Sequence, residues 1–281
     1  MARLEATALL CLSTLAAIGC SGAPMAVGPG SEASAVSPAG EACDRARATE
    51  SAAALVRRLQ GDGIVLYAAA DFPDPDGLSS ALRQAVSPDA RVEPFLMSTG
   101  ELSGPGGTRP ALLDGRVPRA LDDYAPFAVE GSISPLVAEV GGGAPFAVAV
   151  GRGLARALGV RVGDVVPIAS RDIYDAPSGV TARVVAILGW PPELETYDEG
   201  HVLMSLPAAR ATLFRAPEGD EITGLTVYTR SPDDLDRVEE TLLATPSRPY
   251  QLWTFEQLHR GLLDEVEALR RACPAVRPTG R

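Results

Sequence analysis

The sequence contains no lysine, so all 25 of its basic residues are arginines. Aspartate and glutamate together number 36, which gives a formal net charge of −11. An acidic chain is poorly suited to nucleic acid, whose phosphates attract a basic surface. We therefore expect no nucleic-acid partner.

Motifs that mark common active sites are also missing. No serine stands in a Gly-x-Ser-x-Gly elbow, and the Gly104 to Gly107 loop lacks the phosphate-binding pattern. The best cluster of metal-ligand residue types is Asp198, Glu199 and His201. A metal-dependent hydrolase that uses this cluster is one alternative. We favour a protein that is not an enzyme and has no cofactor, because acids in a loop before a strand are usually solvated.

Long apolar runs are confined to the first 19 residues, where Leu9 to Gly19 follows Arg3 and leads directly into Cys20. This order is typical of a secretory leader. The Ala17-Ile18-Gly19-Cys20 run resembles the lipobox of a bacterial lipoprotein signal, which implies that residues 1–19 are removed and Cys20 carries lipid. An ordinary signal peptide, cut near Ala23 or Ala26, is the alternative. No other stretch approaches the roughly 20 apolar residues of a membrane-spanning helix.

The region after the leader divides into a tether, a folded part and a tail. Residues 20–42 are almost entirely small residues and proline, too poor in bulky apolar side chains to fold. We expect a folded domain over 43–273 and a disordered tail over 274–281.

Two cysteines remain once Cys11 is removed with the leader and Cys20 is lipidated. Cys43 precedes a helical pattern from Asp44 to Leu59, and Cys273 follows another over Thr254 to Arg271. An even number of cysteines in an oxidising compartment favours a disulfide, so we predict a Cys43–Cys273 bond between packed N- and C-terminal helices. Two unpaired thiols are the alternative.

Short strand and helix patterns alternate irregularly through the folded part, which predicts an α+β fold. We expect two small α/β subdomains, divided near 61–145 and 146–253. The first begins as a β-α-β-β, porter-like layer, and the second is a mixed strand and helix subdomain. The helices expected in the second are 152–158, 206–214 and 232–244, and the strands include 180–188, 200–205 and 222–229.

One segment resembles a known family. Gly151 to Asp164 has the short helix and Val-Gly-Asp turn of the MacB-like periplasmic core domain, found in lipoprotein-releasing LolC/LolE-type and FtsX-like ABC transporter permeases. Further similar segments follow in the family's order: Tyr197 to Ala209, Ile222 to Val227, and Trp253 to Leu258. The sequence departs from the family at Leu113 to Arg116, where members usually carry a glycine, an aliphatic residue, an aspartate and a proline.

The resemblance implies a binding function, since family permeases also have membrane helices and work with an ATPase, and we find neither pattern in this sequence. Trp190, Pro191, Pro192 and Tyr197 suit contact with a protein partner. The alternative for Trp190 is a core position at the end of a strand. Asp172 and Tyr174 lie where lipoprotein-releasing members carry a projecting loop, and are further candidate contacts.

These observations predict a lipid-anchored periplasmic accessory of envelope lipoprotein or ABC transport. Its partner would be an envelope protein or lipoprotein, or a permease and ATPase complex. Ser21 after Cys20 slightly favours the outer membrane. A degenerate permease fragment is the remaining alternative.

Overall fold

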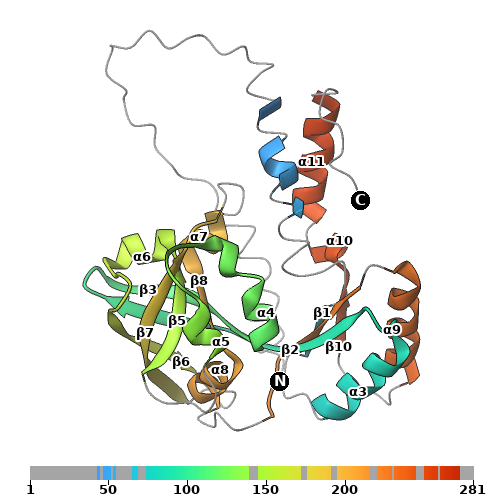
Figure 1. Ribbon diagram of the computed structural model, residues 1–281, viewed down its shortest axis with the longest axis horizontal. Coiled ribbons are helices and arrows are strands. Elements are labelled where there is room, and N and C mark those ends of the chain that lie inside the picture. The colour runs from blue at the N-terminus through green and yellow to red at the C-terminus, as the bar shows by residue number, and fades with distance from the viewer. Residues whose placement is uncertain are drawn as a thin grey trace. The chain divides into compact units, whose positions relative to one another are not determined.

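The computed structural model describes residues 43–44, 47–51, 53–54, 65–68, 74–138, 145–171, 176–190, 195–214, 220–229, 231–244, 250–258 and 260–272. The chain forms two compact units, one from Met1–Ala54 with His259–Arg281 and the other from Leu55–Leu258. The second unit carries all ten described strands (Figure 1). Within the described ranges, none of the helices has the length and hydropathy that a membrane-spanning segment requires.

The first unit joins helical residues 43–44, 47–51 and 53–54 to helix α11, Arg260–Ala272. Thr49, Ala53 and Val266 are its buried described side chains. The predicted helix over Thr254 to Arg271 is divided into α10, Phe255–Leu258, and α11. A capping box begins α10, because Gln257 N donates to Thr254 Oγ1 and Thr254 N donates to Gln257 Oε1.

An antiparallel layer in the second unit is built from both ends of that unit. Its strands are β1 (Val65–Ala68), the first part of β2 (Arg91–Gly104), β9 (Gly224–Tyr228) and β10 (Tyr250–Trp253), in the order β10-β1-β9-β2. Helix α3 (Pro75–Ala85) connects β1 to β2, and α9 (Pro232–Ala244) connects β9 to β10. Two such interleaved β-α-β units make a ferredoxin-like layer. The α3 helix begins where Asp74 accepts from Gly77 N, and it buries Leu78 and Leu82.

A small barrel is formed by the second part of β2 together with strands that lie between β2 and β9 in the sequence. It contains β2, β3 (Gly107–Arg116), β8 (His201–Ser205), β5 (Phe146–Gly151), β7 (Pro177–Leu188) and β6 (Val165–Arg171), and β6 pairs back with β2. Closure leaves no free edge within this ring. Side chains alternate between the core and the outside along β6, where Val166 and Ile168 are buried. The barrel core also contains Leu102, Leu113, Val148, Val184, Val202 and Met204.

Helices α6 (Arg152–Leu158) and α8 (Leu206–Leu213) pack on the barrel (Figure 1). Gly159 ends α6 in a left-handed conformation, with φ of 67°, as a helix C-terminus often requires. The β2–β3 turn lies against this end, and Gly106 N donates to Leu158 O at 2.8 Å. A Cβ at Gly106 would lie 2.4 Å from Ala157 O, so this approach requires glycine.

A connector that the sequence patterns did not predict lies between β3 and β5. It contains α4 (Pro118–Asp122), the 3-10 helix η1 (Ala125–Phe127), β4 (Ala128–Gly131) and α5 (Ser134–Val137). Each element is too short for a helix or strand period to be recognised. The prediction for the segment before β8 was also wrong in detail. Glu195–Gly200 forms helix α7, whereas a loop was expected there and Gly200 was expected in the strand.

The α+β fold class is confirmed, but the predicted subdomain boundary near residue 145 is wrong. The ferredoxin-like layer combines β1, α3 and the first part of β2 with β9, α9 and β10, because β9 pairs with both β1 and β2. The barrel takes β2 and β3 from before that boundary and β5 to β8 from after it. Strand pairing between distant segments is not visible in local patterns, so the boundary could be predicted only from the order of the elements along the chain.

Candidate functional site

A buried ionic cluster lies on the barrel wall. Asp114 is central: Arg116 Nε donates to its Oδ1 at 2.5 Å, Tyr124 OH donates to its Oδ2 at 3.2 Å, and His201 Nε2 lies 3.1 Å from the same Oδ2. All four side chains are buried. A buried carboxylate is tolerable only when it is paired and hydrogen-bonded, and Asp114 is both.

The cluster is assembled by alternation on β3 and by pairing with β8. Leu113 belongs to the barrel core, so Asp114 and Arg116 lie on the opposite face of the strand. The neighbouring parallel strand β8 brings His201 into register with Leu112, one same-face position from Asp114. The signal available in the sequence was an aspartate and an arginine two residues apart in the otherwise apolar second part of the strand, Pro110 to Arg116, at the segment that departs from the family pattern.

Arg116 and His201 control the ionisation of Asp114. Burial by itself raises the pKa of Asp114, but the charge of Arg116 and the hydrogen bond with His201 outweigh it, and the pKa falls to about 2. Burial likewise lowers the pKa of Arg116, but Asp114 reverses that effect and the pKa is raised. The two groups therefore form a stable ion pair.

Aromatic rings cover this cluster. Trp190, which follows β7, stacks on Phe127 with ring centroids 4.8 Å apart, and meets His201 edge-on at 5.7 Å. Tyr124 stacks on His201 at 6.0 Å. Trp190 is only 4% exposed. The expectation that Trp190 offers an exposed aromatic contact is wrong, and the alternative of a core residue at a strand end is the one observed.

Asp198 and His201, expected together in a hydrolase site, have different partners. The Asp198 carboxylate in α7 accepts from Gly153 N at 3.0 Å and from Trp190 N at 3.1 Å, and lies 3.5 Å from Arg152 Nε. It thereby joins α7 to the start of α6 and to the end of β7. Glu199 is exposed. Among the described residues no three His, Cys, Asp or Glu side chains are placed to hold a metal ion.

A second charged layer lies beside the ionic cluster, between β2, β9 and α4. Arg91 pairs with Asp123 at 3.3 Å and with Glu93 at 3.5 Å, and its guanidinium lies 4.2 Å from the ring centroid of Tyr228. Burial raises the pKa of Glu93, opposed by Arg91 and Arg119, and burial raises the pKa of Tyr228 to about 12. This layer ties the connector to the ferredoxin-like sheet.

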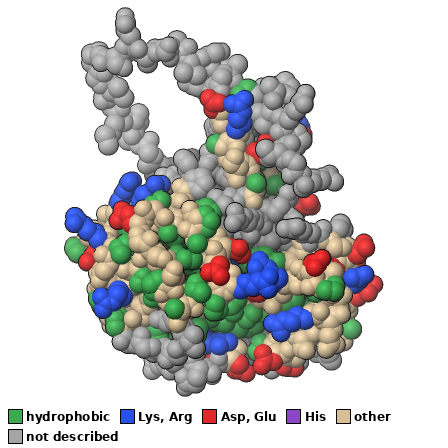
Figure 2. Space-filling model, in the orientation of Figure 1, with side chains coloured by type: hydrophobic (Ala, Val, Ile, Leu, Met, Phe, Trp, Pro, Cys, Tyr) green, Lys and Arg blue, Asp and Glu red, His purple; other side chains and the backbone are tan. Residues whose placement is uncertain are grey.

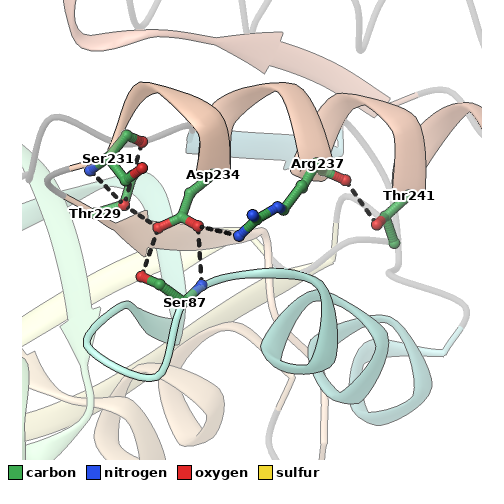
Figure 3. Close-up of polar contacts among 6 residues, drawn as sticks. All are labelled: Ser87, Thr229, Ser231, Asp234, Arg237 and Thr241. Carbon is green, nitrogen blue, oxygen red and sulfur yellow. Dashed lines mark hydrogen bonds and ion pairs between the residues drawn. The ribbon is translucent and has the colours of Figure 1, made fainter.

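A third polar network joins the two helices of the ferredoxin-like layer (Figure 3). Asp234 in α9 accepts from Ser87 N at 2.9 Å and Ser87 Oγ at 2.7 Å, just after α3. It also accepts from Thr229 Oγ1, and Arg237 lies 3.3 Å away. Burial opposes ionisation of Asp234, but the hydrogen bonds from Thr229 and Ser87 prevail and its pKa is lowered. Ser231 and Thr241 complete the network as drawn.

The remaining predicted site residues are only partly covered by the structure. Tyr197 belongs to α7, but its side chain lies outside the described part, as do Asp172, Tyr174, Cys20 and Cys273. Cys43 lies in the described helical segment of the first unit. Their predicted roles in partner binding, lipidation and the disulfide stay predictions.

The surface over the ferredoxin-like helices is acidic. Side chains exposed on α9 include Asp233, Asp236, Glu239 and Glu240. Acidic side chains gather around the α3 and α9 side of the molecule in Figure 2, whereas hydrophobic and charged side chains are mixed over the α4 and α5 region.

The fold and the site define an α+β domain that consists of a ferredoxin-like layer and an inserted barrel. The polar cluster around Asp114 is buried inside this domain. The chain belongs to the MacB-like periplasmic core domain family, whose sequence model matches residues 25–245. The resemblance predicted from the sequence is therefore confirmed, and the family supports a periplasmic location. No curated protein sequence matches the chain.

The solved structures similar to this chain include two that share little sequence identity with it. One is the periplasmic region of MacB from Actinobacillus actinomycetemcomitans, with 13% identity, a TM-score of 0.46, and coverage of 74% of this chain and 96% of the other. The second is the extracellular domain of the noncanonic ABC-type transporter YknZ from Gram-positive bacteria. It has 13% identity, a TM-score of 0.43, and coverage of 68% of this chain and 100% of the other.

Proposed function

We propose that this chain is a lipid-anchored periplasmic protein that binds an envelope partner and serves as an accessory of lipoprotein or ABC-type transport. The anchor would be Cys20, and the partner an envelope protein or lipoprotein, or a permease and ATPase complex. Membership of the MacB-like periplasmic core domain family supports the location. The lipobox-like run before Cys20 supports the anchor.

One observation supports the binding function: the side chains that could act as acids or bases contact other parts of the protein itself. Arg116, Tyr124 and His201 all contact the carboxylate of Asp114, under a cover of aromatic rings. Asp198 accepts from two backbone amides and pairs with an arginine. A catalytic acid or base must reach its substrate, directly or through a water molecule. These groups are directed instead toward the protein's own backbone and side chains, which favours recognition through the surface.

The hydrolase alternative has no supporting observation, since Asp198 and His201 have separate partners. The alternative of a degenerate fragment differs from an accessory in one respect, because a fragment without a role has no specific partner. Co-purification therefore separates the accessory from the fragment.

The experiment is mild detergent extraction of the tagged, full-length protein from its own cells, followed by quantitative mass spectrometry. We expect one envelope protein, or one transporter complex, to co-purify at a constant ratio to the chain. The matched control carries an ordinary secretory leader in place of residues 1–20, so that the same domain is exported without the lipid. Extraction of the chain alone in every detergent would contradict the binding function.

A further inference from the structure

We propose that the free edge of β4 is a docking site for an extended, basic segment of a partner protein, which adds to the sheet as a further strand. This inference rests on the proposed binding function and specifies its surface. Strand addition of this kind uses main-chain hydrogen bonds for affinity and side-chain contacts for specificity.

Strand β4 ends the strand order of the sheet. It pairs with β7, where Ala128 is in register with Leu188 and Gly131 with Ala186, and it has no second neighbour among the described strands. The register shifts between Ala128 and Glu130, so Val129 stands at a bulge. Residues 129–131 are all exposed, and an exposed edge presents unpaired N–H and C=O groups.

Exposed apolar side chains gather beside this edge. Within the described residues, four large hydrophobic side chains are exposed, and three of them are Val129 at 52%, Val162 at 40% and Val165 at 49%. Val165 begins β6, which pairs with the same side of β7 as β4 does. A Cβ at Gly131 would lie 3.1 Å from Val162 Cγ2, so the turn before β6 reaches β4. A group of exposed apolar side chains favours an interaction surface over chance exposure.

A hollow beside β4 offers room for side chains of an added strand. Its volume is about 350 Å³. Small residues from the connector line most of it, including Ala125, Ala128, Gly131, Ser132 and Ala138. The lining comes from the end of α4, from η1, β4 and α5, and from the residues directly before and after α5.

The charges around the hollow indicate the chemistry of the occupant. Asp122 lines the hollow and Glu130 lies on the strand, and both are exposed. Arg161 and Arg183 are exposed and do not line the hollow: Arg161 precedes Val162, and Arg183 is in register with Val165. We therefore expect a lysine or arginine of the partner on the α4 and α5 side and an apolar residue against Val129. A second copy of this chain fits less well, because two chains of net charge −11 repel each other.

The test is in-cell photo-crosslinking of the full-length chain with p-benzoylphenylalanine at position 130, with position 240 on α9 as the control site. Glu130 and Glu240 are both exposed glutamates, one on the proposed edge and one away from it. The cross-linked partner segment is identified by mass spectrometry. Two further variants are compared. Val129→Asp removes the proposed apolar contact. Leu243→Asp is its matched control, because Leu243 is the fourth exposed hydrophobic residue and lies on α9, where it is 80% exposed.

We expect a heterologous adduct at position 130 and none at 240, with a partner segment that contains lysine or arginine. Val129→Asp should reduce its yield about tenfold, as for a central apolar contact, and Leu243→Asp should leave it unchanged. Asp122→Arg should reduce the yield about threefold, the scale of one exposed charge pair. A partner that co-purifies equally with both aspartate variants would overturn the docking site and leave the proposed function standing. An adduct between two copies would also overturn it, and no co-purifying protein at all would overturn the proposed function itself.

Discussion

His201 and Asp114 lie on neighbouring parallel strands and meet inside the protein, with His201 Nε2 3.1 Å from Asp114 Oδ2. His201, one of the two histidines of the sequence, therefore has a structural role. The same aspartate holds Arg116 and Tyr124, so a single carboxylate links β3, β8 and the connector. Removal of this charge should therefore affect the folded state more than any surface contact.

Replacement of Asp114 tests the role of the ionic cluster. Asp114→Asn leaves Arg116 buried without a countercharge, and we expect it to lower the free energy of unfolding by about 3 to 5 kcal/mol. Urea denaturation followed by circular dichroism measures this change. Asp123→Asn is the control, because its ion pair with Arg91 is partly exposed and should contribute less than about 1 kcal/mol. Equal stability of the two variants would refute a structural role for the cluster.

The acid sensitivity of the protein should also depend on Asp114. Its pKa is about 2 in the folded protein against an ordinary 3.8, so the folded state binds this proton less readily than the unfolded state. The corresponding stability, about 2 kcal/mol, is present above pH 4 and is lost as the pH falls from about 4 to 2. Urea unfolding at a series of pH values should show the gap between wild type and Asp114→Asn closing by that amount. A gap that does not change with pH would contradict the shifted pKa.

Asp198 should behave as a structural acceptor. Asp198→Ala leaves the amides of Gly153 and Trp190 without their acceptor, and we expect a loss of about 1 to 3 kcal/mol. The fluorescence of Trp190 should change with it, since the backbone of that residue is held by Asp198. Glu199→Ala, one residue along the same helix and exposed, should have almost no effect. A zinc-dependent hydrolytic activity that both substitutions abolish would support the hydrolase alternative instead.

The Asp234 network predicts a difference between two adjacent aspartates of α9. Asp234→Ala removes the acceptor of Ser87 N and Ser87 Oγ, and should cost about 2 kcal/mol in thermal or urea unfolding. Asp233→Ala, exposed at the same helix start, should cost less than about 1 kcal/mol. Similar losses in both variants would mean that the helix start, rather than the buried network, accounts for the effect.

The predicted Cys43–Cys273 disulfide would close nearly the whole folded region into one loop. Cys43 is disulfide-bonded, but Cys273 lies outside the described residues, so the pairing of these two cysteines stays a prediction. The chain-entropy relation gives such a bond about 4 to 5 kcal/mol. Titration of the unfolded, unreduced mature protein should find no thiol from either residue. Two reactive thiols would exclude the bond and leave the unpaired alternative.

Much of the fold could be predicted because its elements carry local signals. The helix Arg152–Leu158 has a glycine at its end, α9 has a proline at its start, and β6 and β7 alternate between buried and exposed residues. The connector around β4 gave no such signal, since four residues do not establish a period. The candidate site was harder, because Asp114 and His201 are distant in sequence and meet only through pairing of β3 with β8. Trp190 could be expected either at the surface or in the core, and only its packing against Phe127 shows that it is buried.

Native mass spectrometry of the detergent-extracted, full-length chain would show whether this domain works as a lipid-anchored binding protein, as we propose. We expect a chain that begins at Cys20, carries the mass of an attached lipid, and is bound to a second, different protein. An unmodified chain that begins near Ala23 or Ala26 and has no bound protein would contradict it.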